Sequence, residues 1–414
     1  MDVIDICRRA SETAPRLATL PSETKDAALV AMADALEARG SFLAEANAED
    51  VERAKSDGTS AAVIDRLTLT EGRVASMAAG LRSVATQPDP VGEIVKGWKR
   101  PNGILIQQVR VPLGVVAVIY EARPNVTADV AGLCIKSGNA CVLRGSSTAL
   151  ASNRGIVEVL RSAAEQAGLP ADSIQLVLDA SRDAATQLMQ AKGYVDLLVP
   201  RGGKELIRSI EANATVPYII DGDGNCHVYV DASADPKMAT DIVLNAKTQR
   251  FSVCNAAESL VVHAEIADKW LVEALDALDA KGVEIRGDGR VRQLWPKATE
   301  ATDEDWATEY LDLKIAVRVV DSLDEAIAHV NRWGTSNAEA IVTGDVRAAR
   351  RFATEIDSGS VFINCSTRFS DGGEFGYGAE IGISTQKLHA RGPMGLRELT
   401  TVKYVVWGDG QVRE

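Results

Sequence analysis

Cysteine and histidine are scarce in this sequence of 414 residues, and their spacing excludes several kinds of site. There are four histidines and no His-Glu-x-x-His cluster, so a catalytic metal is not expected. No Cys-x-x-Cys pair is present, which argues against a disulfide framework and against a structural zinc site. The cysteines stand far apart, at Cys7, Cys134, Cys141, Cys226, Cys254 and Cys365. Isolated cysteines of this kind are typical of a protein from a reducing cytoplasm.

Long apolar runs and an excess of positive charge are also missing. No apolar run approaches the length of a membrane span, and the N-terminal residues lack the basic start and apolar core of a secretory signal. The net charge is −13, which argues against nucleic acid or an anionic membrane as a partner. With 46% hydrophobic and 25% charged residues, the composition is that of a soluble globular protein with two or three domains.

The first part of the chain, residues 2–87, has the apolar periodicity of helices. Ser22 is a candidate cap for a helix that ends at Gly40, and Thr70 is a candidate cap for another that ends near Thr86. These helices contain no cluster of chemically reactive side chains. We therefore expect them to be scaffold.

A tight-turn signal, Pro101-Asn102-Gly103, predicts a β-hairpin over residues 96–111. Near the C-terminus, residues 400–407 have the composition of a strand. A hairpin far from an obvious core often projects outward, and an edge strand pairs readily with another chain. Residues 96–111 and 398–414 are therefore candidate oligomerisation elements.

Between these elements, apolar strands alternate with helical segments. The predicted strands are 115–119, 140–143, 174–178, 195–199, 260–262, 315–320, 338–343 and 361–363, with helices between them. Repeated alternation with unbroken apolar strands predicts doubly wound parallel sheets, that is, an α/β fold. The predicted domains are residues 1–95 with 112–250, and residues 251–385.

Cys254 lies on a short polar loop between a predicted helix and a predicted strand. Lys247 and Arg250 are close to it in sequence, and cationic neighbours raise the thiolate fraction of a cysteine. Cys254 is therefore a candidate nucleophile. The alternative, from this stretch alone, is a buried and unreactive cysteine.

Two turns from strand to helix are rich in small residues and carry a basic side chain. The first contains Arg144, Gly145, Ser146 and Ser147, and the second contains Gly202, Gly203 and Lys204. Such turns let an anionic ligand approach the free N–H groups at a helix start. Neither turn matches a dinucleotide or P-loop fingerprint, and the alternative is that the small residues only make tight turns.

Polar side chains also gather in two further segments. Glu121, Arg123 and Asn125 follow the first predicted parallel strand, where an amide could donate to a developing oxyanion. A later hydroxyl-rich cationic set suits a phosphate or carboxylate ligand and comprises Ser366, Thr367, Arg368, Lys387, His389 and Arg391. The alternatives are a polar turn around Pro124 and a solvated loop.

Several motifs together resemble those of the gamma-glutamyl phosphate reductases, a family within the aldehyde dehydrogenase superfamily. The resemblance covers nearly the whole chain and is carried by Val111–Asn125, the Cys254 segment, Trp333–Glu339, Gly378–Thr385 and Leu388–Leu396. It implies two doubly wound Rossmann-like domains with a small oligomerisation hairpin and strand. The first predicted domain would bind the cofactor, NADPH, and the second would be catalytic.

The resemblance also implies roles for individual residues. Cys254 matches the nucleophile, and Asn125 matches the amide that binds the oxyanion together with the Cys254 backbone N–H. Arg144 falls near the adenosine ribose, Glu309 near the nicotinamide ribose, and Gly202 and Gly203 on the side of the pyrophosphate. The remaining residues of the first small-residue turn and Lys204 would support the cofactor. The predicted substrate contacts are Glu121, Arg123, Arg250, Ser366, Thr367, Arg368, His389 and Arg391.

Oxidising members of the superfamily use a Glu to activate the water that hydrolyses the thioester. The matching segment, Asp221–His227, has no Glu, although Asp221 or Asp223 could take its place. The expected activity is therefore NADPH-dependent reduction of L-glutamate 5-phosphate to L-glutamate 5-semialdehyde in proline biosynthesis, through a Cys254 thioester. The alternatives are an oxidising aldehyde dehydrogenase and an inactive scaffold homologue. A homo-oligomer, a dimer or tetramer, and an association with glutamate 5-kinase are the expected partners.

Overall fold

The computed structural model describes residues 2–413, except for the side chain of residue 62, and the chain divides into two compact units. Unit 1 contains Met1–Ile220, Gly376–Gly382 and Met394–Glu414, and unit 2 contains Asp221–Phe375 and Ile383–Pro393. The short strands β14 (Gly382–Ser384) and β15 (Gly392–Met394) pair with each other where the chain passes between the units.

Unit 1 is built on a four-stranded parallel sheet with the order β5-β4-β3-β6. Its strands are β3 (Val115–Tyr120), β4 (Ala140–Arg144), β5 (Ile174–Leu176) and β6 (Leu197–Arg201). All six residues of β3 are buried, as expected of a central strand that is covered on both faces. The carboxyl ends of these strands share one edge of the sheet, where ligands of open α/β sheets bind.

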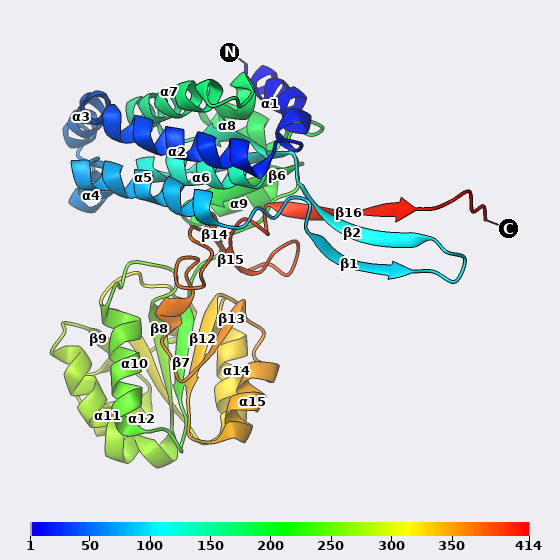
Figure 1. Cartoon of the computed structure of the whole chain (residues 1–414). Helices are drawn as coiled ribbons and strands as arrows, with labels where there is room; N and C mark the ends of the chain where they lie inside the picture. The colour runs from blue at the N-terminus through cyan, green and yellow to red at the C-terminus, as the bar shows by residue number, and fades with distance from the viewer. Residues whose placement is uncertain (1, 414) are drawn as a thin grey trace. The chain divides into compact units, whose positions relative to one another are not determined.

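Helices pack around this sheet (Figure 1). They are α1 (Val3–Leu17), α2 (Ser22–Ala38), α3 (Gly40–Ser56), α4 (Ala61–Leu67), α5 (Glu71–Thr86), α6 (Pro124–Lys136), α7 (Leu150–Gln166), α8 (Arg182–Met189) and α9 (Lys204–Asn213), with the 3-10 turns η1 (Ser147–Ala149) and η2 (Ala171–Ser173). Thr70 caps α5 as predicted, because its hydroxyl accepts from the N–H of Arg73. The predicted cap at Ser22 is wrong: Ser22 is the first residue of α2, and its hydroxyl donates to Asp89 at 2.6 Å.

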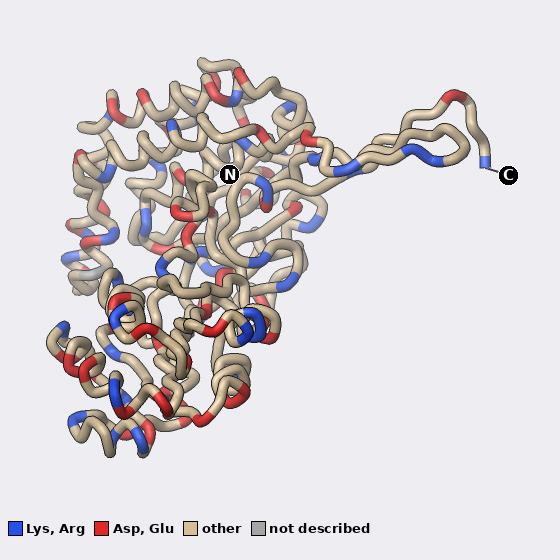
Figure 2. Tube along the Cα trace, turned by 60° about the horizontal axis from the view of Figure 1, so that its bottom comes forward, with Lys and Arg blue, Asp and Glu red and all other residues tan. Residues whose placement is uncertain are grey.

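A three-stranded antiparallel ribbon projects from unit 1 (Figure 1). Its order is β1-β2-β16, with β1 (Ile94–Lys99), β2 (Leu105–Pro112) and β16 (Thr400–Trp407), so the predicted hairpin and final strand are confirmed as elements. The charged residues on these strands are all basic, in contrast to the acidic chain as a whole (Figure 2). The ribbon also carries exposed aromatic side chains, among them Trp98, Tyr404 and Trp407.

Unit 2 contains a seven-stranded parallel sheet with the order β10-β9-β11-β8-β7-β12-β13. The strands are β7 (Cys226–Val230), β8 (Ala257–His263), β9 (Glu284–Gly287), β10 (Thr299–Glu300), β11 (Lys314–Val320), β12 (Ala338–Val342) and β13 (Ser360–Ile363). The helices are α10 (Pro236–Thr248), α11 (Ala264–Asp279), α12 (Gly289–Leu294), α13 (Asp303–Ala307), α14 (Leu323–Trp333) and α15 (Val346–Glu355), with the 3-10 turn η3 (Thr367–Phe369).

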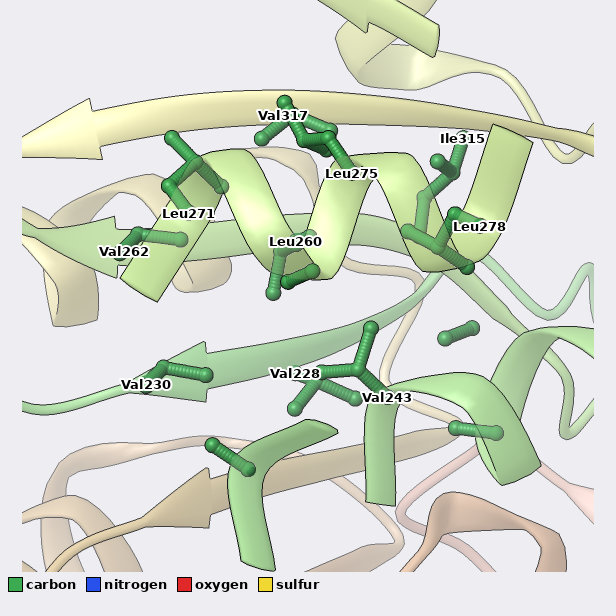
Figure 3. Close-up of a cluster of buried hydrophobic side chains, with 14 of the residues drawn as sticks. Val228, Val230, Val243, Leu260, Val262, Leu271, Leu275, Leu278, Ile315 and Val317 are labelled. Atoms are coloured by element: carbon green, nitrogen blue, oxygen red, sulfur yellow. The ribbon is translucent and has the colours of Figure 1, made fainter. Parts of the chain in front are cut away.

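The core of unit 2 explains where the units divide. Leu271, Leu275 and Leu278 lie on one face of α11 and pack over the apolar residues of β8 and β11 (Figure 3). Val228 of β7 and Val243 of α10 belong to the same core. The division therefore follows Ile220, whereas the sequence predicted it after residue 250, because β7 and α10 bury their apolar faces in unit 2. Among residues 2–413, no helix has the length and apolar character needed to cross a membrane.

Candidate functional site

In unit 2, Cys254 lies on the loop between α10 and β8, where it is partly exposed. The backbone of Gly224 packs directly on the Cys254 backbone: a Cβ at Gly224 would lie 1.6 Å from the Cys254 carbonyl oxygen. The buried thiol of Cys226 donates to the same oxygen at 3.1 Å. Gly224 and the first residue of β7 therefore fix the loop of the predicted nucleophile.

The basic residues around this loop differ from the prediction in one respect. Lys247 does not act as a cationic neighbour of Cys254, because its Nζ is bound to Glu258 at 2.6 Å and both side chains are fully buried. Arg368 lies in the field of Arg250 and Cys254: burial lowers the pKa of Arg368, Arg250 lowers it further, and the thiol opposes this. Arg368 therefore lies within electrostatic range of both Arg250 and Cys254, and its Nε donates to Gln249 at 2.9 Å.

The hydroxyl residues of the later predicted set hold the cysteine loop in place. Thr367 is fully buried and donates to the carbonyl of Asn255 at 2.7 Å. The side chain of Asn255 in turn donates to the carbonyl of Ser370 at 2.8 Å. Ser366 is buried and caps η3. Thr367 and Ser366 were predicted as substrate contacts, but in this structure their hydroxyl groups are committed to the backbone.

Two further members of that set, Lys387 and Arg391, bind Asp357. Arg391 binds the Asp357 carboxylate at 2.7 Å, and Lys387 binds it at 2.6 Å. These two cations lower the pKa of Asp357. His389 is exposed between them in sequence. A phosphate or carboxylate ligand of Arg391 would therefore have to compete with Asp357.

Glu309, predicted at the nicotinamide ribose, also belongs to unit 2. Its Oε1 accepts from the N–H of Gly224 at 2.7 Å, so it lies next to the residue that packs on Cys254. Thr335 binds both sides of the same segment, since its hydroxyl donates to the carbonyl of Asp223 and accepts from the N–H of Asn225. Sequence reasoning missed Gly224, Cys226 and Thr335. The glycines of Asp221–His227 were the available signal of a close backbone approach.

In unit 1, four predicted positions follow two neighbouring strands at the carboxyl edge of the sheet. Glu121 follows β3, and its Oε1 accepts from the N–H of Gly203 at 2.7 Å, at the start of α9. A Cβ at Gly202 would lie 2.8 Å from that carboxylate oxygen, so the glycine also has a packing role. Lys204 is the first residue of α9. Glu121 thus occupies the position that an anionic ligand of this helix would take.

In the first small-residue turn, the predicted cofactor-binding residues also make structural contacts within unit 1. Arg144 ends β4, and its Nη2 donates to the carbonyls of Ala180 and Ser181 at 2.5 and 3.0 Å. Its Nε is buried and has no hydrogen-bond partner among the described residues, and burial lowers its pKa. A Cβ at Gly145 would meet the Asn153 amide at 2.0 Å. Ser146 caps η1, which begins at Ser147.

Asn125 lies in the first turn of α6 with its side chain exposed. Its Nδ2 donates to Asp129 at 3.0 Å, one helical turn later. Burial raises the pKa of Asp129 to about 6, and Asn125 and Arg201 act in the opposite direction. The carboxylate orients the amide, so that one N–H of Asn125 is directed to Asp129. Arg123 precedes the helix and is half-buried.

Within residues 2–413, no three His, Cys, Asp or Glu side chains are grouped as a metal site.

Comparison with known proteins adds independent findings. A model of the aldehyde dehydrogenase family matches residues 1–288 and 315–405. The gamma-glutamyl phosphate reductase of Thermobifida fusca is 55% identical over 412 residues, covering 100% of this chain and 99% of that protein. The protein of the same name from Moorella thermoacetica is 55% identical over 407 residues, covering 98% and 97%. The crystal structure of gamma-glutamyl phosphate reductase from Thermotoga maritima is 44% identical and covers 100% of both chains, with a TM-score of 0.98.

Proposed function

Because this chain belongs to the aldehyde dehydrogenase family, we propose that it reduces L-glutamate 5-phosphate to L-glutamate 5-semialdehyde and phosphate with NADPH, a step of proline biosynthesis. The observation that carries the proposal is the full-length similarity to proteins named gamma-glutamyl phosphate reductase. These relatives do not favour the two alternatives, an oxidising aldehyde dehydrogenase and an inactive scaffold. The family is one of oxidoreductases that use a nicotinamide cofactor, and the choice of NADPH is part of the proposal.

In the proposed reaction, the thiolate of Cys254 attacks the acyl-phosphate carbonyl. A carbon–sulfur bond forms, the bond to phosphate breaks, and a thioester remains on Cys254. The Cys254 N–H donates to the oxyanion, and the resemblance assigns a second donation to the amide of Asn125. Arg368, which lies within electrostatic range of Cys254, favours the thiolate and an anionic substrate. Phosphate is a good leaving group, so acylation needs little acid catalysis.

NADPH, when bound, supplies the hydride that reduces the thioester carbonyl, after which the carbon–sulfur bond breaks and the aldehyde leaves. The residues of unit 1 fit such a cofactor. Arg144 offers a buried Nε, and Gly202 and Gly203 present backbone N–H groups at the start of α9, all at the carboxyl edge of one sheet. The resemblance assigns the nicotinamide ribose to Glu309, a residue of unit 2.

The thioester must react with hydride and not with water. Gly224 and Cys226 of the Asp221–His227 segment contact the Cys254 backbone, and neither carries a carboxylate. A glycine and a buried thiol cannot act as the general base that hydrolysis needs. This supports the reductive direction.

The proposal includes a homo-oligomer that forms through the projecting ribbon of β1, β2 and β16. Within residues 2–413, the outer edges of β1 and β16 pair with no further strand, and their exposed aromatic side chains favour burial against another subunit. An association with glutamate 5-kinase and a cytoplasmic location are further predictions. Sedimentation of the protein with and without residues 400–414 would test the oligomer.

Substitution of the nucleophile tests the proposed function. Cys254→Ser should lose reductase activity by at least about 10³-fold, because a serine hydroxyl is a far weaker nucleophile at neutral pH. Cys365→Ser, which alters the other partly exposed thiol, is the matched control and should keep wild-type activity. Mass spectrometry after addition of the acyl phosphate without cofactor should find the acyl group on Cys254. A Cys254→Ser enzyme within tenfold of wild type would refute the covalent mechanism.

A further inference from the structure

A buried ion pair encloses the segment that carries Cys254. Lys247 lies in the last turn of α10, and Glu258 lies in β8, so the pair joins the two ends of residues 248–257. Nζ of Lys247 and Oε2 of Glu258 are 2.6 Å apart, and both side chains have 0% exposure. The pair therefore closes the cysteine loop at its base.

The cost of burying these charges indicates a role beyond stability. Burial raises the pKa of Glu258 to about 7 against the opposing effect of Lys247, and it lowers the pKa of Lys247. Removing two charges from water is expensive, and replacement of a buried pair by apolar residues is often neutral or stabilising. A buried ion pair is better explained when one of its groups makes a hydrogen bond that an apolar side chain could not make.

The second carboxylate oxygen of Glu258 binds the backbone of a neighbouring loop. Oε1 accepts from the N–H of Leu311 at 3.2 Å. Leu311 has a φ of 53°, a left-handed conformation that a leucine rarely adopts without outside support. Glu309 lies two residues earlier on this turn, so the hydrogen bond fixes the backbone that carries Glu309.

These contacts form a closed ring within unit 2. Glu309 accepts from Gly224, Gly224 packs on the Cys254 backbone, and Cys254 lies between Lys247 and Glu258 in sequence. A displacement at one member is therefore transmitted to the others through short contacts. The ring contains both the predicted nucleophile and the predicted ribose-binding carboxylate.

We propose that Glu258, anchored by its ion pair with Lys247, is a positioning residue: its hydrogen bond from the Leu311 N–H holds Glu309 in register with Cys254. This inference rests on the proposed function, which assigns those two residues their roles. Because both side chains of the pair are fully buried, neither would contact substrate or cofactor directly. Glu258 acts through its hydrogen bond from the Leu311 N–H.

Two double variants separate this role from a contribution to folding. Lys247→Met with Glu258→Gln removes both charges, yet the glutamine carbonyl can still accept from the Leu311 N–H. Lys247→Met with Glu258→Leu removes the charges and leaves that N–H without its acceptor. We would measure the melting temperature, the Kd of NADPH by fluorescence titration, and the rate of Cys254 alkylation by iodoacetamide. The last two measurements do not require turnover.

In the variant that keeps the acceptor, the Kd of NADPH and the rate of Cys254 alkylation should both stay within about threefold of wild type. The variant that lacks it should bind NADPH about tenfold more weakly, the equivalent of one lost buried hydrogen bond, and change its alkylation rate by about fivefold or more. Equal NADPH binding and equal alkylation in the two variants would overturn the proposal. Failure of the Gln variant to fold would also overturn it, because the pair would then be a requirement of the fold. If wild type binds no NADPH, the proposed function fails, and the alkylation rates alone decide the positioning role.

Discussion

Addition of one methyl group at Gly224 should disable the site while leaving the fold of the molecule in place. A Cβ at this position would lie 1.6 Å from the Cys254 carbonyl oxygen and 2.3 Å from its carbonyl carbon, whereas real Cβ atoms essentially never come within 3.0 Å of another group. The clash is with backbone, which cannot rotate away as a flexible side chain can. The two segments must therefore separate by at least 1.4 Å in Gly224→Ala.

The magnitude follows from the position of the clash. A displacement of about 1 Å at a reacting group costs roughly 10²-fold in rate, and the same shift weakens the bonds from Cys226 to the Cys254 carbonyl and from Gly224 to Glu309. Overpacking also destabilises by about 1–3 kcal/mol. We therefore expect kcat to fall by about 10²-fold or more, with a lower but measurable melting temperature.

Steady-state NADPH oxidation and a thermal melt would be measured for Gly224→Ala beside Gly289→Ala. Gly289 also lies in unit 2, at the start of α12, and a Cβ there would meet no atom within 4 Å. The control should keep wild-type kcat. A Gly224→Ala enzyme whose kcat stays within threefold of wild type would refute the close approach and the role of Gly224 in positioning Cys254.

Two further predictions concern charged groups. Burial, with a smaller contribution from the nearby His227 and Arg318, lowers the pKa of His329 to about 2, so below pH 6.5 only the unfolded chain takes up its proton. The free energy of unfolding should therefore fall as the pH drops from 6.5 to about 5. In His329→Gln, the slope of that free energy against pH, measured by urea unfolding, should be smaller by about 1.4 kcal/mol per pH unit. An unchanged slope would contradict the lowered pKa of His329. Glu121→Gln removes a carboxylate from the N–H of Gly203, so the KM for NADPH should fall by about three- to tenfold, and a higher KM would contradict competition at that helix start.

Elements with an unbroken apolar pattern could be predicted from the sequence. The central strand β3 and the hairpin around Pro101-Asn102-Gly103 were predicted within a few residues of their observed bounds, because local composition determines both. Strand β7 was missed. His227 interrupts its apolar run, and only the tertiary partner Glu339, bound at 3.1 Å, makes that histidine acceptable in a core. For the same reason the compact units divide after Ile220, ahead of the domain boundary predicted at residue 250.

In the site, too, the sequence predicted what depends on neighbouring residues and missed what depends on contacts with residues far along the chain. The sequence identified Cys254 as a candidate because its residue type and loop are local properties. It predicted Lys247 as an activating cation because the two residues are close in sequence, but the partner that takes its charge, Glu258, lies on the next strand. The roles of Gly224 and Thr367 depend on contacts with residues far along the chain, and no local pattern records those contacts.

The proposed acyl transfer between Cys254 and phosphate is tested most directly in the reverse direction. The protein would be incubated with NADP⁺ and L-glutamate 5-semialdehyde, with and without inorganic phosphate, and NADPH would be followed by its absorbance. We expect a rate that requires phosphate, because phosphate is the group that releases the acyl chain from the thioester. A rate that is the same without phosphate would mean that water ends the reaction, and it would contradict an acyl-phosphate reductase in favour of an oxidising dehydrogenase.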